Sequence, residues 1–380
     1  MSYCQNLKDK KMKVSILTSV YNKGPWLSRW FNCVCGQSFK DIEIVVVDNA
    51  STDESSQIIK EYAAKDSRIK VVTITKNQGP SGGKNAALEN SSGEYLTFAD
   101  ADDYMDNDYV EKLYRSITEE NADLAVCVND LVFPSSPATH KEWPKNPRNI
   151  IQGEQVKLLP CQLLDELSDK YFGFHMPELG ATWIKMYKSS IVKANNIHFN
   201  NKLWIWDDFD FNIQYVQKVS KVVYINTTVY HFYQSENSAT RSIGYNPKHP
   251  VRVIWAIESI CSRLGDIQDA RLKKAALKFY FLRFRDILNY LEANKSSVSA
   301  KEYTNVYTQL VSSKPIKELF ECKDLSFLLS SERNLLWFAK HGHLSAFFFY
   351  NKIVQFIKEG LKHFLKSVGL FEQCKKIIKG

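Results

Sequence analysis

An acidic stretch, FADADDYMDNDYV (residues 98–110), directly follows an apolar run that predicts a buried strand. Within it, Asp100 and Asp102 are two residues apart, and in an extended segment such side chains point to the same side. Two carboxylates placed in this way could share one divalent cation, which prefers oxygen ligands and also binds phosphates. The alternative is turn chemistry and capping of the helix that follows, which Asp106 or Asn107 could supply alone. That alternative leaves Asp100 and Asp102 unexplained.

Two further polar groups follow predicted strands. Asp48 comes directly after IEIVVV, where a carboxylate could accept hydrogen bonds from a base NH or a ribose hydroxyl. The alternative, the first turn of the next helix, accounts for Ser51, Thr52 and Asp53 but not clearly for Asp48. NQGPSGGKNAAL (residues 77–88) combines three glycines with Lys84 and Asn85 at a helix start. Backbone amides and a cation there suit a phosphate-bearing ligand, whereas glycine loops without function also occur.

Alternating strands and helices must position these groups. The run at 42–47 has almost no polar alternation, which is typical of a strand covered on both faces in a parallel sheet. Ser51 or Thr52 is expected to cap the second helix. Strands are predicted at 13–20, 42–47, 69–75 and 95–103, and helices at 25–37, from the cap to about 65, at 82–91 and at 108–120. This order predicts an open α/β sheet with right-handed crossovers.

In such sheets, ligands bind beyond the carboxyl ends of the strands. We therefore expect one edge to gather Tyr21, Asn22, Asp48, Asn77 and Asp100. The acidic stretch lies on that edge, which counts against a random solvated loop.

The regular alternation ends near residue 121. ADLAVCVNDLVF (122–133) predicts another strand, and a segment rich in Pro, Ser, His and Lys follows at 134–150. From residue 250 onward the sequence reads as helical and is basic and apolar. We expect a catalytic α/β domain over residues 1–245 and a helical domain over residues 246–380.

The composition excludes several classes of protein. The net charge of +8 is consistent with anionic partners, but the absence of a recognition motif or an Arg-rich stripe argues against nucleic acid. The eight cysteines are scattered without a CxxC pair, so a disulfide scaffold or structural zinc site is not expected. No signal peptide and no run of 18 apolar residues is visible, which predicts a cytoplasmic protein.

Five ordered motifs give the chain a family resemblance: VSILTSVYNKGPWL, EIVVVDNASTD, NQGPSGGKNAAL, GEYLTFADADDYMDNDY and WDDFDF. In order and spacing they resemble family 2 glycosyltransferases, over roughly residues 12–242. That family comprises inverting enzymes with the nucleotide-sugar-binding GT-A fold, a Rossmann-like, mostly parallel α/β sheet. The resemblance does not cover the C-terminal third.

The resemblance implies roles for individual residues. Asp100 and Asp102 match a metal site for Mn²⁺ or Mg²⁺, which would bridge the donor diphosphate and act as Lewis acid on the leaving group. Asp48 matches the carboxylate that recognises uracil or another base. His231 is a candidate third metal ligand, although a lone histidine in a strand is more often structural. The implied donor-binding set is Ser19, Val20, Tyr21, Asp48, Lys84, Asn85, Asp100 and Ala101.

The acidic pair in WDDFDF matches the position of the family's catalytic base. Asp208 resembles the base that takes the acceptor hydroxyl's proton, and Asp207 is its neighbour and the second candidate. The alternative is an acidic helix N-terminus, which would explain Asp207 or Asp210 equally well.

Three positions depart from the family pattern: Ser19 stands where Pro is common, Asn49 where a second Asp is common, and Lys84 where Arg is common. Lysine at 84 should preserve positive charge but lose bidentate geometry.

The resemblance thus implies a metal-dependent inverting glycosyltransferase. It would move a sugar from a nucleotide-diphosphate sugar, expected to be a UDP-sugar, to a hydroxyl of a glycan or lipid-linked glycan in bacterial surface polysaccharide or lipooligosaccharide synthesis. Two alternatives are a nucleotidyltransferase and a non-catalytic protein that binds glycan or membrane. The missing GxGxxG after the first strand and the Asp207/Asp208 pair argue against the former, and intact Asp100, Asp102 and Asp208 against the latter.

The C-terminal segment predicts a basic amphipathic helix. Residues 341–380 hold seven lysines and two glutamates. Such a helix could lie on an anionic membrane surface, here the cytoplasmic face of the inner membrane. It could instead pack on the catalytic domain or on a second subunit, which leaves the oligomeric state open. One face carries Ile353, Phe356, Ile357, Leu361, Phe364 and Val368, and the other carries Lys352, Lys358, Lys362 and Lys366.

Overall fold

The chain divides into two compact units in a computed structural model, which describes residues 12–133, 136–139, 146–165, 171–172, 179–234 and 245–367. The first unit comprises Met1–Leu159 and Pro177–Ile243, and the second comprises Pro160–Met176 and Gly244–Gly380. The predicted boundary follows residue 245 and leaves 160–176 in the first domain. Of the described residues in that segment, Asp165 contacts the helical unit, where it pairs with Lys278 at 3.7 Å.

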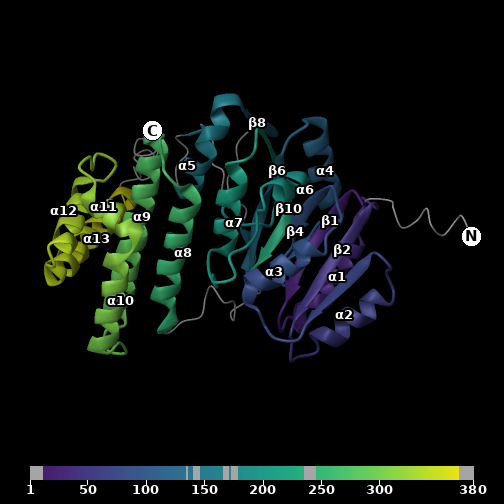
Figure 1. The fold of residues 1–380 in the computed structure, drawn as a ribbon, viewed down its shortest axis with the longest axis horizontal. Helices are drawn as coiled ribbons and strands as arrows, with labels where there is room; N and C mark the ends of the chain where they lie inside the picture. The colour runs from purple at the N-terminus through teal and green to yellow at the C-terminus, as the bar shows by residue number, and fades with distance from the viewer. Residues whose placement is uncertain are drawn as a thin grey trace, which may run out of the picture. The chain divides into compact units, whose positions relative to one another are not determined.

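A ten-stranded sheet forms the centre of the first unit, counted over the described residues (Figure 1). Its order is β3-β2-β1-β4-β9-β6-β10-β5, with β7 on β6 and β8 on β10. The first four strands are parallel neighbours, as predicted, and β6 and β10 are also parallel. The strands are β1 (Val14–Val20), β2 (Ile42–Asn49), β3 (Ile69–Ile74), β4 (Tyr95–Phe98), β5 (Tyr104–Met105), β6 (Leu124–Phe133), β7 (Ser136–Thr139), β8 (Arg148–Gln152), β9 (Lys185–Lys188) and β10 (Lys221–Tyr233).

Helices cover this sheet, and α1, α2 and α3 begin after the carboxyl ends of β1, β2 and β3. Among them, α3 packs on β1 and β2, and α4 packs on β6 and β10. All eight residues of β2 are buried, as its apolar sequence predicts. The helices are α1 (Gly24–Cys35), α2 (Ser55–Ala63), α3 (Gly79–Glu89), α4 (Tyr109–Glu119), α6 (Ser189–Ala194) and α7 (Asp207–Val216), with a 3₁₀ turn, η1 (Gly153–Leu158).

The predicted cap of the second helix is wrong. The helix α2 begins at Ser55, after Glu54. Ser51 instead accepts a hydrogen bond from the Asn22 amide at 3.2 Å, and the Thr52 amide donates to Asn22 Oδ1 at 2.8 Å. Both candidate caps are thus used to join the β1–α1 and β2–α2 loops.

The second unit is helical over the residues described, which confirms the expected helical C-terminal region (Figure 1). Within it, α9 packs on α8, α10 and α11, and α12 packs on α13. None of the described helices is long and apolar enough to cross a membrane. The helices are α5 (Leu159–Leu164), α8 (Lys248–Leu264), α9 (Ala270–Ala293), α10 (Ala300–Ser312), α11 (Lys314–Glu321), α12 (Ser330–Lys340) and α13 (Leu344–Ser367).

Candidate active site

The turn after β4 carries the predicted Asp-x-Asp pair. Asp100 lies at the carboxyl end of β4, and the Asp103 amide closes the turn by donating to its carbonyl at 3.1 Å. The carboxylate of Asp102 is partly exposed and forms an ion pair with the ammonium of Lys23. Ala101, between the two, is buried. The strand predicted over 95–103 therefore ends at Phe98, and the two aspartates lie on the turn that follows it rather than in the predicted extended segment.

Asp103 has a different role from its neighbours. It is fully buried, and its carboxylate accepts hydrogen bonds from the Tyr230 hydroxyl at 2.7 Å and the Tyr233 amide at 2.9 Å. The Tyr230 oxygen also accepts from the Asp100 amide at 3.2 Å. Asp103 therefore fixes the acidic turn to β10.

The second acidic pair opens helix α7. Trp206, which precedes it, has a left-handed backbone with φ of 58°, a conformation that costs a non-glycine residue free energy and is often found at functional sites. Asp207 and Asp208 follow in the first helical turn, where the helix dipole favours carboxylates. Asp208 Oδ2 also accepts the Thr182 amide at 3.3 Å.

Lys84 on α3 joins this pair to the edge of the sheet. Its ammonium lies 2.9 Å from Asp207 Oδ2 and also pairs with Asp208 Oδ1. The side chain is only 12% exposed, and the ammonium lies 5.3 Å from the centroid of the Phe199 ring. Residues separated by more than 120 positions are therefore brought together around one buried cation.

The charges of these groups are coupled. Burial raises the pKa of Asp100 to about 7, against the opposing effect of Lys84 and with a further contribution from Asp208 and Asp102. Burial opposes the charge of Lys84, but Asp207, Asp208 and Asp100 outweigh it and raise the pKa of this lysine above its ordinary value. The Asp-x-Asp turn and the α7 pair therefore interact electrostatically, with Lys84 as the cation that both feel.

The ends of β1 and β2 form the adjoining part of the edge. Both oxygens of Asp48 accept hydrogen bonds, one from the Ser51 amide at 3.0 Å and one from the Ser56 hydroxyl. Val20 is buried in the core, whereas Tyr21 is 44% exposed. Ser19 lies so close to Gly83 that a Cβ at residue 83 would be 1.9 Å from its Oγ. Glycine at 83 therefore lets α3 approach the end of β1.

Asn49, one of the departures from the family pattern, has a structural use. It is buried, its Nδ2 donates to the Gly79 carbonyl at 2.8 Å, and its Oδ1 accepts the Gln78 amide at 2.9 Å. A carboxylate could accept the second bond but could not donate the first. The amide thus holds the loop that begins α3, the helix that carries Lys84.

Two predicted residues contact other parts of the unit. Asn85 exchanges hydrogen bonds with the Phe199 main chain at 2.9 Å in both directions. His231 Nε2 lies 3.1 Å from Asp106 Oδ1, and its Nδ1 lies 3.8 Å from Asp130. Successive side chains of a strand point to opposite faces, so Tyr230 faces Asp103 while the next residue, His231, stacks on Tyr104.

The sequence analysis missed two cations beside the acidic turn. Lys23 pairs with Asp102, and Arg29 donates to the Asp102 carbonyl at 2.6 Å. The guanidinium of Arg29 also lies 4.8 Å from the Tyr104 ring centroid and 4.4 Å from that of Tyr233. The sequence could have indicated Lys23, because it lies in the loop after β1, on the edge where ligands were expected.

The donor atoms present fit a magnesium or manganese ion only in part. Asp100 and Asp102 supply the carboxylate oxygens that such ions prefer. Within the described residues, however, no group of three or more His, Cys, Asp or Glu side chains is arranged to hold a metal ion. An ion at this turn would therefore depend on ligands from a bound diphosphate or water in addition to the two aspartates.

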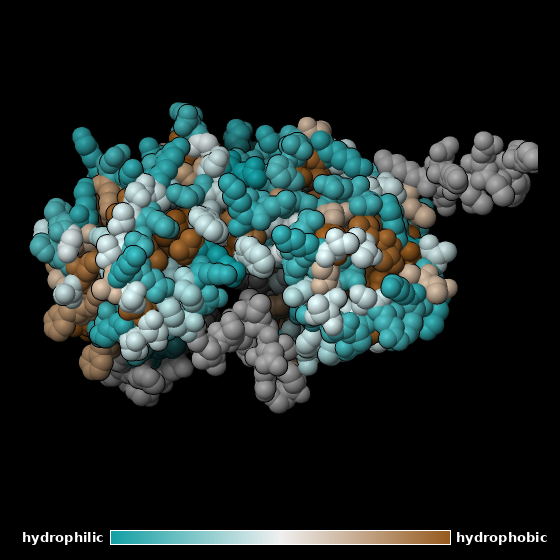
Figure 2. Space-filling model, turned by 60° about the horizontal axis from the view of Figure 1, so that its bottom comes forward, coloured by the Kyte–Doolittle hydropathy of each residue, from teal (hydrophilic) through white to brown (hydrophobic). Residues whose placement is uncertain are grey.

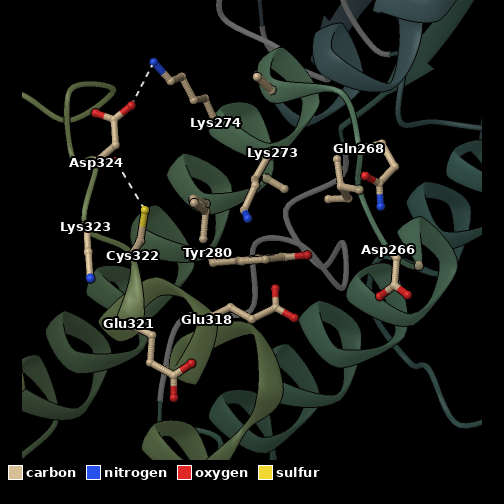
Figure 3. A pocket seen from close by; sticks show the side chains of 15 residues that line it. Asp266, Gln268, Lys273, Lys274, Tyr280, Glu318, Glu321, Cys322, Lys323 and Asp324 are labelled. Carbon is tan, nitrogen blue, oxygen red and sulfur yellow. Dashed lines mark hydrogen bonds and ion pairs between the residues drawn. The ribbon is translucent and has the colours of Figure 1, made fainter.

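A separate pocket of about 740 Å³ lies within the helical unit, around the start of α9 and the end of α11 (Figure 3). Three lysines and four acidic residues line it, and Lys274 pairs with Asp324 at 3.1 Å. Its mixed charge does not favour a strongly anionic ligand. The acidic edge of the first unit remains the candidate active site.

The chain is similar to known glycosyltransferases. Residues 15–174 match the family described as Glycosyl transferase family 2. The chain is 29% identical over 281 residues to a cholesterol galactosyltransferase of Borreliella burgdorferi, covering 73% of this chain and 76% of that protein. It is 43% identical over 114 residues to glycosyltransferase GlyA of Streptococcus pneumoniae, but the match covers 30% of this chain and 16% of that protein.

A solved structure shows the same fold. Residues 1–349 of Staphylococcus aureus TarS, in complex with UDP-GlcNAc, superimpose with a TM-score of 0.69 at 19% identity. The superposition covers 90% of this chain and 92% of the TarS fragment. The architecture is therefore the GT-A fold with a helical C-terminal region.

Proposed function

We propose that the chain, whose residues 15–174 match the family described as Glycosyl transferase family 2, transfers a sugar from a nucleotide-diphosphate sugar to a hydroxyl of a glycan acceptor, with inversion. One observation carries this proposal: Lys84, on the helix that packs on β1 and β2, pairs with both carboxylates of the α7 pair. The transfer requires the donor diphosphate and the attacking hydroxyl to come together beside a carboxylate base.

In this proposal Asp208 is the general base. Its carboxylate takes the proton of the acceptor hydroxyl as that oxygen bonds to the anomeric carbon, while the bond from this carbon to the diphosphate oxygen breaks. Lys84 and the Thr182 amide hold the carboxylate in place. Asp207 shares the lysine and remains the second candidate.

Asp100 and Asp102 would hold a Mn²⁺ or Mg²⁺ ion, with further ligands from the donor. When bound, the ion would neutralise charge that develops on the leaving diphosphate. His231 is a weaker candidate ligand, because its ring is engaged by Asp106 and Tyr104.

We propose a UDP-sugar as the donor. Asp48 lies at the edge where a uracil would be read, and TarS, with the same fold, has been solved with UDP-GlcNAc. The acceptor we propose is a glycan or lipid-linked glycan of the bacterial surface. Relatives named for action on cholesterol and on poly(ribitol-phosphate) support a surface acceptor.

A donor screen tests this assignment. The full chain with Mn²⁺ is incubated with UDP-, GDP- and CMP-sugars, and release of the nucleotide is followed. We expect metal-dependent UDP release from one sugar, abolished in Asp102→Ala and Asp208→Ala. A folded protein that neither binds nor turns over any nucleotide sugar would contradict the proposal.

We further propose that the enzyme works at an anionic membrane surface, through the helix α13. Phe356 and Ile357 are 78% and 59% exposed, and Phe349 and Ile353 are also exposed. Their spacing of four, seven and eight residues places all four on one face of the helix. Figure 2 shows hydrophobic surface (brown and tan) at the left, where α12 and α13 lie.

The opposite face of α13 attaches it to its own unit. Phe347 is buried, and the Asn351 amide donates to Asn289 Oδ1 at 2.8 Å. The apolar face therefore points away from the packing face, beside exposed lysines such as Lys352. Apolar side chains flanked by lysines suit the interface of an anionic bilayer. Val368, at the end of the predicted face, lies outside the described residues.

Vesicle sedimentation tests the membrane proposal. We expect the full chain to bind vesicles that contain phosphatidylglycerol more than neutral phosphatidylcholine vesicles, and the double variant Phe356→Glu/Ile357→Glu to lose this binding. Trp255→Glu, at an exposed apolar position on α8, is the matched control and should still bind. Equal sedimentation of the double variant and the wild type would exclude this face as the contact.

A further inference from the structure

The ion pair between Lys23 and Asp102 occupies a carboxylate that the proposed metal ion would need. Lys23 is the residue that precedes α1, and its main chain is fixed: its amide donates to Ser55 Oγ at 2.9 Å, and the Gly24 amide donates to Asp53 Oδ2 at 3.0 Å. The side chain is 32% exposed. Lys23 is therefore anchored at the edge with an ammonium that remains free to move.

We propose that Lys23 is an exchangeable counter-ion, which a divalent ion displaces from Asp102 and which then binds the donor diphosphate. This inference rests on the proposed function. An ammonium and a divalent ion repel each other, so both cannot occupy the same carboxylate oxygen at full strength. The released ammonium stays near the edge because the Lys23 main chain does not need to move.

Lys23 already has a second contact in the state in which it pairs with Asp102. Its Nζ lies 5.5 Å from the ring centroid of Trp26, within the range of a cation–π interaction. Asp100 and Asp102 would hold the ion, and a diphosphate that binds the ion would bring further oxygens to the edge where Lys23 lies. The flexible stem of a lysine, with three donors at its end, suits such an exchange of partners.

Two binding measurements in opposite directions test the inference. For Lys23→Met we expect Mn²⁺ alone, measured by electron paramagnetic resonance on the full chain, to bind roughly two- to fivefold more tightly, which is the range for a partly exposed ion pair. With saturating Mn²⁺, we expect UDP to bind more weakly to this variant by calorimetry. A residue with only a structural role would not move these two affinities in opposite directions.

Two control variants complete the test. Lys23→Arg keeps the charge and should shift both affinities less than Lys23→Met. Lys221→Met breaks a comparable partly exposed pair with Glu120, 3.1 Å long and away from the edge, and should change neither affinity. If Lys23→Met binds Mn²⁺ and UDP as the wild type does, the inference fails while the proposed function stands. If the wild type binds no nucleotide under any condition, the proposed function itself fails.

Discussion

Two lysines neutralise the acidic edge of this protein, and they do so in different ways. Lys84 projects from α3, is 12% exposed and pairs with both Asp207 and Asp208. Lys23 precedes α1, is 32% exposed and pairs with Asp102. The first pairing is more enclosed than the second, because Lys84 and Asp207 are the less exposed groups, whereas Asp208 and Asp102 are similarly exposed. Enclosure makes Lys84 part of the framework of the site, whereas exposure leaves Lys23 able to change partners.

The physical basis of this difference is the cost of an unpaired charge. A buried carboxylate that loses its partner is left in a medium of low dielectric constant, where water cannot replace the lost interaction. An exposed carboxylate that loses its partner is solvated by water. The same chemical pair, lysine and aspartate, therefore supports structure in one place and exchange in the other.

The largest effect on catalysis is expected at the two aspartates that pair with Lys84. Asp208→Asn should lower kcat by about 10²–10⁴-fold, the usual contribution of a general base, while the donor KM changes little. Asp207→Asn should lower kcat less, because we assign Asp207 to holding Lys84. Turnover of the donor identified in the screen measures both. A larger loss of kcat in Asp207→Asn than in Asp208→Asn would make Asp207 the general base and Asp208 the partner that holds Lys84.

The second largest effect is expected on stability, where substitution of Lys84 should cost more than substitution of Lys23. Lys84→Met leaves two largely buried carboxylates without their cation and should lower the free energy of unfolding by roughly 3 kcal/mol. Lys23→Met should lower it by less than about 1 kcal/mol. Urea denaturation of both variants beside the wild type measures the difference. Equal losses would show that exposure does not separate the two pairs.

A smaller effect is expected at Asn49, which orders the start of the helix that carries Lys84. Asn49→Asp removes the donor to the Gly79 carbonyl and should cost about 1–3 kcal/mol, the range for an unsatisfied buried group. Asn195→Asp is a matched control, because Asn195 is an exposed asparagine that donates to a main-chain carbonyl at 2.9 Å. Its free energy of unfolding should change by less than that of Asn49→Asp. Urea midpoints compare the two, and an unchanged midpoint in Asn49→Asp would contradict the role given to the amide.

Much of the first unit follows from local sequence. Apolar runs such as IEIVVV and the alternation of strands with helices indicate where β1 to β4 and α1 to α4 form, because the apolar content and spacing of a run can be read without knowing its partners. The parallel order then places Asp48 and Asp100 at one edge. The cap of α2 was mispredicted because Ser51 and Thr52 bond to Asn22, 29 and 30 positions away.

The sequence by itself indicated the carboxyl edge and the Asp100–Asp102 pair on it, since the alternation of strands with helices and the spacing of residues can be read locally. Only the tertiary structure decided which cation neutralises which carboxylate. Lys23 and Asp102 are 79 positions apart, and Lys84 and Asp207 are 123 apart. The register of β10 likewise turned His231 toward Tyr104 and Asp106. Such pairings depend on how distant elements pack, and a one-residue shift in register would reverse the face that each side chain occupies.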